Sequence, residues 1–392
     1  MTAIAPVSTD ALLPVYRRLP LEIVSGSGVR LTDAEGRSYL DFTSGIAVNA
    51  LGYGDPGLVD VMRSAAEGLI HVSNLYSTAP GRTLADALVS KSFASNVFFC
   101  NSGAEANEAT FKFARRWSRT TRDASAVEIL ALRGSFHGRL FGSLAATDRP
   151  AYRAPFRPLA PGISIVERDI DAIEGALLGG TVAAVIAEPV QGEGGVRVLA
   201  PEFLRALRQL TRAHGVALIF DEVQCGLGRT GTFFAYEQAG VEPDMLTLAK
   251  PLAGGLPMGA VLLSEEIAAT IKPGDHATTF GGGPFVSSVA NYVVERLSDP
   301  DLLDAVRSNG AWLGSQLTSM AQRLPSVRAA RGIGYMWGFD VTIPAAQVVS
   351  AAMEAGLLVC SAGEHTVRLL PPLVATRDEL AEGVAILEDI LR

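Results

Sequence analysis

The chain has 392 residues, of which 48% are hydrophobic and 19% charged. This excludes a disordered protein and predicts a large core in two domains, or in one large domain with a smaller attachment. The formal net charge of -8 argues against a nucleic-acid-binding surface, because such surfaces use Lys and Arg to neutralise phosphates. No apolar run approaches membrane-spanning length, and the first residues lack the basic start and apolar core of a signal peptide.

The three cysteines, Cys100, Cys225 and Cys360, are widely separated in the chain. Their spacing fits neither a disulfide framework nor a zinc site, so no metal site is predicted. Such cysteine use is typical of a reducing compartment. We therefore expect a cytoplasmic protein that binds neither nucleic acid nor a membrane.

Residues 1–55 contain the segment GVRLTDAEGRSYLDF, in which apolar and polar residues alternate around a turn signal. This pattern predicts a β-hairpin or a meander. It differs from the pattern of the following residues, so we expect these 55 residues to belong to a different domain.

Residues 56–299 alternate short runs rich in Val, Ile and Leu with amphipathic helical patterns. The helix expected at 201–215 has Pro201 in its first turn, Phe203, Leu207 and Leu210 on one face, and Gly215 as its stop. The strand-like runs are NVFFC, VEILAL, TVAAVIAEPV, VALIF, MLTLA and GAVLL. This alternation predicts an α/β fold in which helices cover both faces of a mainly parallel sheet. Ligands bind at the carboxyl ends of the strands in such sheets.

Residues 300–392 carry a long helical pattern, the strand-like segment VRLLPPL and a closing helix. We expect these residues and residues 1–55 to form one small α/β domain. Residues 56–299 would then form the large domain that it flanks.

Four consecutive strands are predicted to bring polar residues to one edge of the large sheet. NVFFC leads to residues 101–104 and VEILAL leads to residues 136–139, while VALIF ends at Asp221 and MLTLA ends at Lys250. A helix start, an aromatic pair with an arginine, a carboxylate and a lysine would therefore meet. We interpret this set as a binding site for pyridoxal 5'-phosphate.

Each member of the set has a chemical role in such a site. Burial lowers the pKa of an amine, so a desolvated Lys250 becomes a nucleophile that can form a Schiff base with an aldehyde. Asp221 beside the pyridine nitrogen would favour the protonated ring, which acts as an electron sink. The helix start at Gly103 offers free backbone N–H groups to a phosphate, and Phe136 or His137 could stack on the ring.

Each residue alone has an ordinary structural explanation. A strand-end Lys250 can reach water, Asp221 with Glu222 can be a solvated strand end, and His137 can be a satisfied core residue. The segment NSGAEANE can be only a well-capped helix start. It is the order and spacing of the whole set that favour the cofactor site.

The segment GLGRTG, residues 226–231, matches the G-x-G-x-x-G fingerprint of dinucleotide-binding proteins and would suggest an NAD-dependent dehydrogenase. In that fingerprint the strand feeds the glycine turn directly and a long helix follows. Here five residues separate the apolar strand from Gly226, and TFFAYEQAG follows the last glycine. We therefore interpret the segment as a loop beside the site. A catalytically silent regulator with the same fold is a third, remote alternative.

With these residues in place, nearly the whole chain resembles the class III aminotransferases, which are pyridoxal-phosphate enzymes of fold type I. The resemblance begins at LPVYRRLPLEIVSGSGVRL near the N-terminus and extends to VRLLPPL. The motifs that carry it are HVSNLY, FFCNSGAEANEA, SFHGR, EPVQGEGG, IFDEVQCGLGRTG, LAKPLAGGLPMGA and TTFGG.

The resemblance implies a role for each candidate residue. Lys250 is the Schiff-base lysine and proton shuttle, and Asp221 pairs with the pyridine nitrogen. The other implied cofactor contacts are Gly103 and Ala104 at the phosphate, Phe136 on the ring, Gln224 near the ring hydroxyl, and Thr279 at the phosphate of the neighbouring subunit. The implied substrate contacts are Arg139 at the α-carboxylate with Thr278 and Tyr16 as lesser candidates, Arg368 at the keto-acid carboxylate, and Glu193 as the gate of Arg368. The shared phosphate contact implies a homodimer with two shared active sites.

Within the family, the resemblance is strongest to members that act on N2-acetylornithine. It implies transfer of the terminal amino group of N2-acetylornithine to 2-oxoglutarate in arginine biosynthesis, giving N-acetylglutamate semialdehyde and glutamate. Ornithine, succinylornithine, 4-aminobutyrate and a modified lysine are alternative donors. Two positions depart from the family pattern, because LGY at Tyr53 replaces the usual LGH and GGG at Gly283 replaces the usual GGN.

Overall fold

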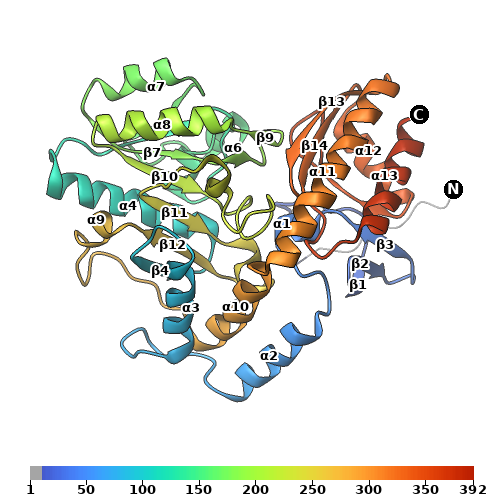
Figure 1. The fold of residues 1–392 in the computed structure, drawn as a ribbon, viewed down its shortest axis with the longest axis horizontal. Coiled ribbons are helices and arrows are strands. Elements are labelled where there is room, and N and C mark those ends of the chain that lie inside the picture. Colours follow the sequence, from blue (N-terminus) through green and yellow to red (C-terminus); the bar gives the residue numbers. More distant parts are fainter. Residues whose placement is uncertain (1–10) are drawn as a thin grey trace.

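A seven-stranded sheet forms the centre of the larger part of the molecule in the computed structural model, which describes residues 11–392 (Figure 1). Strand β12 runs antiparallel to its neighbours β11 and β4, and the remaining pairs are parallel. The strand order is β4 (Asn96–Cys100), β12 (Gly259–Leu263), β11 (Met245–Leu248), β10 (Ala217–Asp221), β7 (Val182–Ala187), β5 (Glu128–Leu132) and β6 (Ile163–Val166). The mainly parallel α/β sheet is confirmed.

One detail of the predicted sheet, the order of the strands that carry the site residues, is wrong. The four strands expected to deliver the site are not consecutive, because β6 and β7 lie between β5 and β10 along the chain. In the sheet, β10 and β11 are neighbours, but β12 separates β4 from β11, and β7 separates β5 from β10. The crossover connections reorder the strands, and a single sequence does not state that order.

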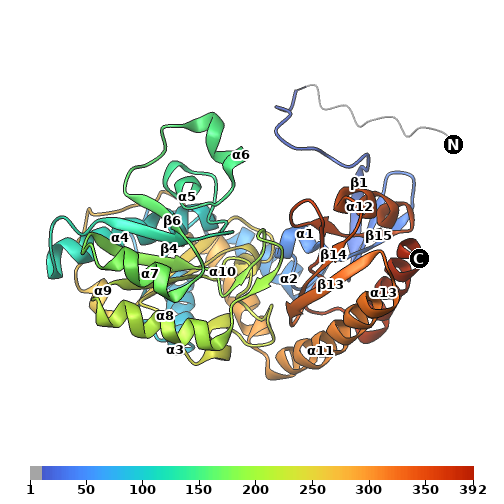
Figure 2. The ribbon, with the colours of Figure 1, turned by 90° about the horizontal axis from the view of Figure 1, so that it is seen from above.

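Alternate strand residues face two different helical layers. On one face, Ile219 of β10 packs in a cluster with Phe111 and Trp117 of α4 (Gly103–Thr121). On the other, Phe220 packs in a cluster with Leu207 of α8. The helices that contribute to this second layer are α3 (Ala79–Ser90), α7 (Ile170–Leu177), α8 (Pro201–Ala213) and α10 (Pro284–Leu297). Helices α7 and α8 lie side by side in both views (Figure 2).

The helix predicted at 201–215 is α8, and its ends follow the expected signals. Pro201 lies in the first turn, and Gly215 after the helix has a φ of +59°, in the left-handed region that favours glycine. Leu204 and Leu207 are buried, while Phe203 and Leu210 are partly buried against the same core. The apolar side of α8 therefore fixes the helix on the sheet.

The smaller part of the molecule joins the two ends of the chain. Strand β3 (Ser38–Asp41) pairs in parallel with β15 (Leu357–Leu358), with Leu40 opposite Leu357. The predicted hairpin is confirmed as β2 (Arg30–Asp33) and β3, and β1 (Ile23–Ser27) completes that sheet. A second sheet has the order β13 (Val327–Ile333), β14 (Met336–Val341), β17 (Thr366–Leu369) and β16 (Cys360–Ser361). The helices here are α11 (Pro300–Arg323), α12 (Ala345–Glu354) and α13 (Arg377–Leu391). The domain boundaries at 55 and 299 stay predictions.

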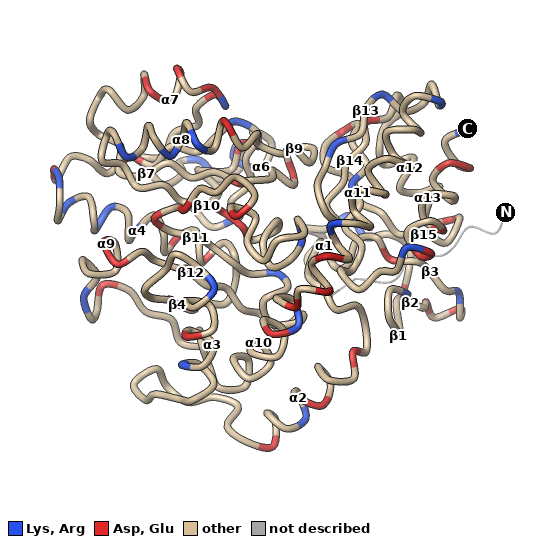
Figure 3. The backbone as a smooth tube through the Cα atoms, in the orientation of Figure 1, with Lys and Arg blue, Asp and Glu red and all other residues tan. Residues whose placement is uncertain are grey.

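The remaining elements are short and connect these layers. They are α1 (Ser44–Ala47), α2 (Pro56–Glu67), α5 (Phe141–Ala145), α6 (Pro150–Arg153), α9 (Glu265–Ala268), the hairpin β8 (Val190–Gln191) with β9 (Arg197–Val198), and the 3-10 turns η1 (Ala154–Phe156), η2 (Ala235–Ala239) and η3 (Lys250–Ala253). Acidic and basic residues are interspersed over both parts (Figure 3). Over residues 11–392, no helix combines the length and the apolar character that crossing a bilayer requires.

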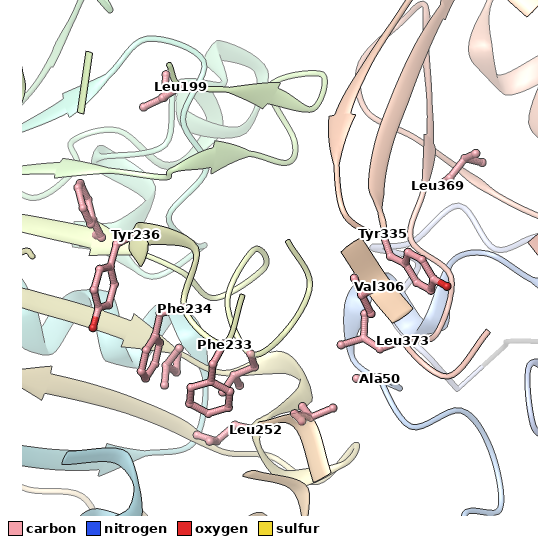
Figure 4. Close-up of a cluster of buried hydrophobic side chains, with 14 of the residues drawn as sticks. Ala50, Leu199, Phe233, Phe234, Tyr236, Leu252, Val306, Tyr335, Leu369 and Leu373 are labelled. Carbon is pink, nitrogen blue, oxygen red and sulfur yellow. The ribbon is translucent and has the colours of Figure 1, made fainter. Parts of the chain in front are cut away.

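A continuous apolar core connects the two parts. Phe233 and Leu252 from the larger part belong to the same buried cluster as Val306, Tyr335 and Leu373 from the smaller part (Figure 4). The GLGRTG loop ends just before Phe233 and is followed by the five residues of η2, not by a long helix. The loop therefore lies at the junction of the two parts.

Candidate active site

A cavity of about 430 Å³ lies where the carboxyl ends of β10 and β11 meet the start of α4. Such a volume is typical of a small-molecule site. Its lining includes eight of the residues singled out from the sequence: Gly103, Ala104, Phe136, Arg139, Glu193, Asp221, Gln224 and Lys250. Chain segments that are far apart in sequence thus meet as the strand-end argument predicts.

Asp221 is held in the cavity wall by three hydrogen bonds. Its Oδ2 accepts from Nδ2 of Asn107 at 2.8 Å and lies 2.7 Å from Nδ1 of His137, while its Oδ1 accepts from the N–H of Val223 at 3.0 Å. Burial by itself would raise the pKa of this carboxyl. The hydrogen bond and charge of His137, followed by the bond from Asn107, lower the pKa below its ordinary value. Asp221 therefore stays ionised in a buried position.

Lys250 lies two residues after the end of β11, as the first residue of η3, and has a φ of +36°, in the left-handed region that is rare for a residue with a side chain. Within residues 11–392 its ammonium forms neither a hydrogen bond nor an ion pair. Burial lowers its pKa, Asp221 opposes this shift, and Arg368 adds to it. A larger fraction of Lys250 is therefore neutral and nucleophilic than for a lysine in water.

The start of α4 forms a cradle for an anion. The hydroxyl of Ser102 accepts from the N–H of Glu105 at 3.2 Å, and the N–H groups of Gly103 and Ala104 are too early in the helix to have intrahelical acceptors. A Cβ at Gly103 would lie 2.7 Å from Cγ1 of Val223, so the backbone here passes too close to Val223 for a side chain. Free N–H groups and the helix dipole make this turn suitable for a phosphate.

Arg368, from the smaller part of the molecule, contacts two residues that line this cavity. It lies in β17 and is 1% exposed, and its Nη1 donates to Oε1 of Glu193 at 2.7 Å and to Oε1 of Gln224 at 3.1 Å. Burial by itself would lower its pKa, but Cys360 and Glu193 raise the pKa above its ordinary value. The predicted contact between Glu193 and Arg368 is therefore present, while its role as a gate stays a prediction.

Arg139 and Phe136 lie at the outer part of the cavity. The Arg139 guanidinium lies over the ring of Tyr152 at 3.6 Å and is 5.8 Å from the ring centroid of Phe136. The backbone N–H of Phe136 donates to Oε1 of Glu188 at 2.9 Å. Arg139 is exposed, so it can turn towards a carboxylate in the cavity.

Besides Arg368, three predicted residues are not part of the lining of this cavity. Thr278 and Thr279 line a second, open cavity of about 950 Å³, and Oγ1 of Thr278 accepts from Nδ2 of Asn101 at 3.2 Å. Tyr16 is 72% exposed and has Arg18 over its ring. Within a single chain, Tyr16, Thr278 and Thr279 are not part of the cavity lining that includes Lys250, and their roles stay predictions.

Three site residues were missed or misjudged in the sequence. Asn107 lies four residues after Gly103, so helix geometry places both on one face, which could have revealed it. Glu188 directly follows β7, and the strand-end argument applied to that strand would have found it. His137 was expected either to stack on a ring or to be structural. Its side chain is instead fully buried against Asp221, and its Nε2 has no partner within residues 11–392.

The two departures from the family pattern lie away from the cavity lining. The hydroxyl of Tyr53 donates to Oδ2 of Asp41 at 2.6 Å. Gly283 precedes α10 as its N-cap and provides no side-chain hydrogen bond there. Both are local packing features of the described structure.

These observations fit pyridoxal 5'-phosphate. The N-terminus of α4 suits its phosphate, and Asp221 is a buried anion suited to a protonated pyridine nitrogen. Lys250, which has no partner among residues 11–392, is an amine suited to its aldehyde. Within residues 11–392 there is no group of three or more His, Cys, Asp or Glu that could hold a metal ion.

Comparison with known proteins agrees with this fit. A family model described as aminotransferase class-III matches residues 14–391. The chain is 45% identical over 381 residues to the mitochondrial acetylornithine aminotransferase of Alnus glutinosa, which covers 96% of this chain and 84% of that protein. The N-acetylornithine aminotransferase structure from Stenotrophomonas maltophilia K279a is 36% identical with a TM-score of 0.84, covering 95% and 96% of the two chains. An ornithine aminotransferase structure from Toxoplasma gondii, with partial occupancy of PLP at its active site, is 30% identical with a TM-score of 0.93, covering 97% and 92%.

Proposed function

This chain belongs to the class III aminotransferases, which use pyridoxal 5'-phosphate, and we propose that it transfers the terminal amino group of N2-acetylornithine to 2-oxoglutarate. The products are N-acetylglutamate semialdehyde and glutamate, and the reaction is a step of arginine biosynthesis. The contact between Arg368 and Glu193 beside an unpaired Lys250 is the observation that carries this proposal. The relatives named for acetylornithine support the choice of donor.

Five parts of the chain would hold the cofactor. The N–H groups of Gly103 and Ala104 would bind its phosphate, the Phe136 side chain would pack against its ring, and Gln224 would bind its hydroxyl. Lys250 would hold it covalently, and Asp221 would pair with the pyridine nitrogen. When bound, the cofactor supplies an electron sink for the charge that remains when a C–H proton leaves the donor.

Lys250 is proposed as the base that moves this proton. Its Nζ, when not bound to the cofactor, would accept the proton that leaves the terminal carbon of the donor, which is the carbon that carries the amino group. Burial lowers the pKa of Lys250, which increases the fraction of the amine that is available as a base. Asp221 remains ionised because His137 and Asn107 bind its Oδ2, so its negative charge is present throughout.

Arg368 and Glu193 are proposed to let one pocket take two kinds of substrate. While Glu193 pairs with Arg368, the arginine is neutralised, and a donor with its carboxylate at the far end meets no free cation there. When Glu193 turns away, the guanidinium becomes free to bind the carboxylate of 2-oxoglutarate through two parallel hydrogen bonds. Arg139 would bind the α-carboxylate of the donor while Glu193 is paired with Arg368.

We also propose a cytoplasmic homodimer with two shared active sites. Thr278 and Thr279 line the second cavity with Leu75 and Tyr76, which are 87% and 70% exposed. Large exposed apolar side chains are typical of an interface with another chain. A partner that covers this surface would bring its own Thr279 to the phosphate end of the first cavity.

A visible absorption spectrum of the purified protein tests this proposal. The band of the bound cofactor should be bleached by N2-acetylornithine at lower concentration than by ornithine or 4-aminobutyrate, and 2-oxoglutarate should restore it. Bleaching by another amine at lower concentration would retain the aminotransferase chemistry and replace the donor. Absence of the band after added pyridoxal 5'-phosphate would contradict the assignment of Lys250.

A further inference from the structure

Glu188 is a buried carboxylate between two loops that line the cavity. It is 6% exposed and follows directly after β7. Its Oε1 accepts from the N–H of Phe136 at 2.9 Å, and its Oε2 accepts from the N–H of Gly192 at 3.3 Å. We call residues 133–139, which carry Phe136, the stacking loop, and residues 190–195, which carry Gly192, the gate loop.

The two loops are also in contact at other points. Nε2 of Gln191 donates to the carbonyl of Arg133 at 3.1 Å. From outside the stacking loop, the guanidinium of Arg149 also donates to the carbonyl of Glu193. A Cβ at Gly194 would lie 2.6 Å from the carbonyl oxygen of Gly134, so the backbones pass very close to each other. The backbone of the gate loop is therefore fixed, although the Glu193 side chain remains 27% exposed.

The carboxylate of Glu188 has an unusual set of partners. Its hydrogen bonds come from backbone N–H groups, one from each loop, and no Lys or Arg pairs with it within residues 11–392. Burial raises its pKa to about 7, with His137 opposing the shift and Asp221 adding to it. A charge this poorly compensated is retained at a structural cost, which points to a functional role.

We infer that Glu188 is a positioning residue that fixes the gate loop against the stacking loop, so that Glu193 moves only by turning its side chain. The inference rests on the proposed function in one respect, because it assigns Arg139 and Arg368 to the two ends of the substrates. Glu188 holds the N–H of Gly192, the residue before Glu193, and that of Phe136, three residues before Arg139. This carboxylate therefore contributes to the distance between the donor end and the acceptor end of the pocket.

The substitution Glu188→Gln separates the two bonds. A glutamine has one accepting oxygen, and the shorter bond to Phe136 should keep it, so the amide nitrogen would face the N–H of Gly192. Hydrogen exchange at Gly192, followed by mass spectrometry on short peptides, should become about ten-fold faster, as expected for a lost bond to a charged acceptor. Exchange at Phe136 should change little.

Steady-state kinetics provide the functional readout. The KM for 2-oxoglutarate should rise about ten-fold, whereas the KM for the donor and kcat should change by less than about three-fold, since the same bond is lost on the gate side only. Glu237→Gln is the matched control, because Glu237 also accepts a backbone N–H bond, from Phe234 at 2.9 Å, but does not line the cavity. That control should leave the exchange at Gly192 and both KM values unchanged.

Two outcomes would overturn the inference. Unchanged exchange at Gly192 would show that Glu188 does not hold the gate loop. Equally faster exchange at distant amides, such as Ala235, would show a general loss of stability in place of a local role. Failure of the proposed donor or acceptor would be visible separately, because the exchange measurement needs no substrate.

Discussion

Two neighbouring carboxylates at the end of β10, Asp221 and Glu222, lie on opposite sides of the chain and have pKa values that shift in opposite directions. Asp221 points into the cavity and binds the side chains of His137 and Asn107, and its pKa is lowered. Glu222 points to the other side, where it accepts the N–H groups of Ala235 at 2.6 Å and Tyr236 at 2.8 Å. Burial raises the pKa of Glu222 to about 8.

The pKa values of Asp221 and Glu222 shift in opposite directions because the two carboxylates have different partners, not because they are buried to different depths. Asp221 and Glu222 are 4% and 1% exposed, so both lose almost all contact with water. An imidazole beside Asp221 favours the charged form, whereas Glu222 has two backbone dipoles and a second carboxylate, Glu237, nearby. A buried acid is kept charged by a specific neighbour, and the chain provides that neighbour only on the cavity side.

The largest effect on activity should come from replacing Lys250, which lines the same cavity as Asp221. Lys250→Ala should lower kcat by more than about 10³-fold, because the variant lacks both the covalent link and the base. Steady-state assays with N2-acetylornithine and 2-oxoglutarate would measure this. Lys91→Ala removes an exposed lysine outside the cavity lining and should retain normal activity. Comparable activity in the two variants would contradict the role of Lys250.

The next effect tests the charge of Asp221. Asp221→Asn keeps a similar shape but removes the negative charge, so we expect kcat to fall by about 10²- to 10³-fold. The pKa shift also sets the sign of the effect on stability. Because the folded pKa is lowered, ionised Asp221 stabilises the fold above its unfolded pKa, and this contribution is lost as pH falls through the folded pKa. An Asp221→Asn variant with normal kcat would show that activity does not require a negative charge at this position.

The smallest expected effect concerns Glu222, whose contribution to stability changes with pH in the direction opposite to that of Asp221. Its folded pKa is raised to about 8, so the folded protein holds more protons than the unfolded chain between about pH 4.5 and pH 8. Stability from this group therefore falls as pH rises through that window, by at most about 1.4 kcal/mol per pH unit. The urea midpoint of Glu222→Gln relative to the unsubstituted protein should rise between pH 5.5 and pH 7.5. A difference that does not depend on pH would show that Glu222 titrates normally.

Much of the fold could be predicted because it depends on local patterns. The hairpin at β2 and β3, the helix α8, the strand that ends at Asp221 and the strand that precedes Lys250 all follow from periodicity and terminal signals. The position of the site follows from one physical rule about the ends of parallel strands. The strand order could not be predicted in this way, because it depends on crossovers between distant segments.

The partners of each site residue were harder to predict than the residues themselves. Nothing local in the sequence indicates that His137 binds Asp221, since 84 residues separate them. Glu188 and Asn107 carried usable signals, but the signals were weaker than those of Lys250 and Asp221. Residues that touch a ligand stand out by their chemistry, whereas residues that hold them are recognised only in three dimensions.

The parallel pairing of β3 with β15 has a consequence for how the protein is made. Leu40 leaves the ribosome long before Leu357, and at typical rates of synthesis the delay is on the order of tens of seconds. During that time the edge of β3 that β15 will cover has no strand to pair with, and unpaired edges promote aggregation. A chain that stops before Leu357 would retain that exposed edge permanently. Synthesis of this protein therefore depends on its last residues to protect some of its first.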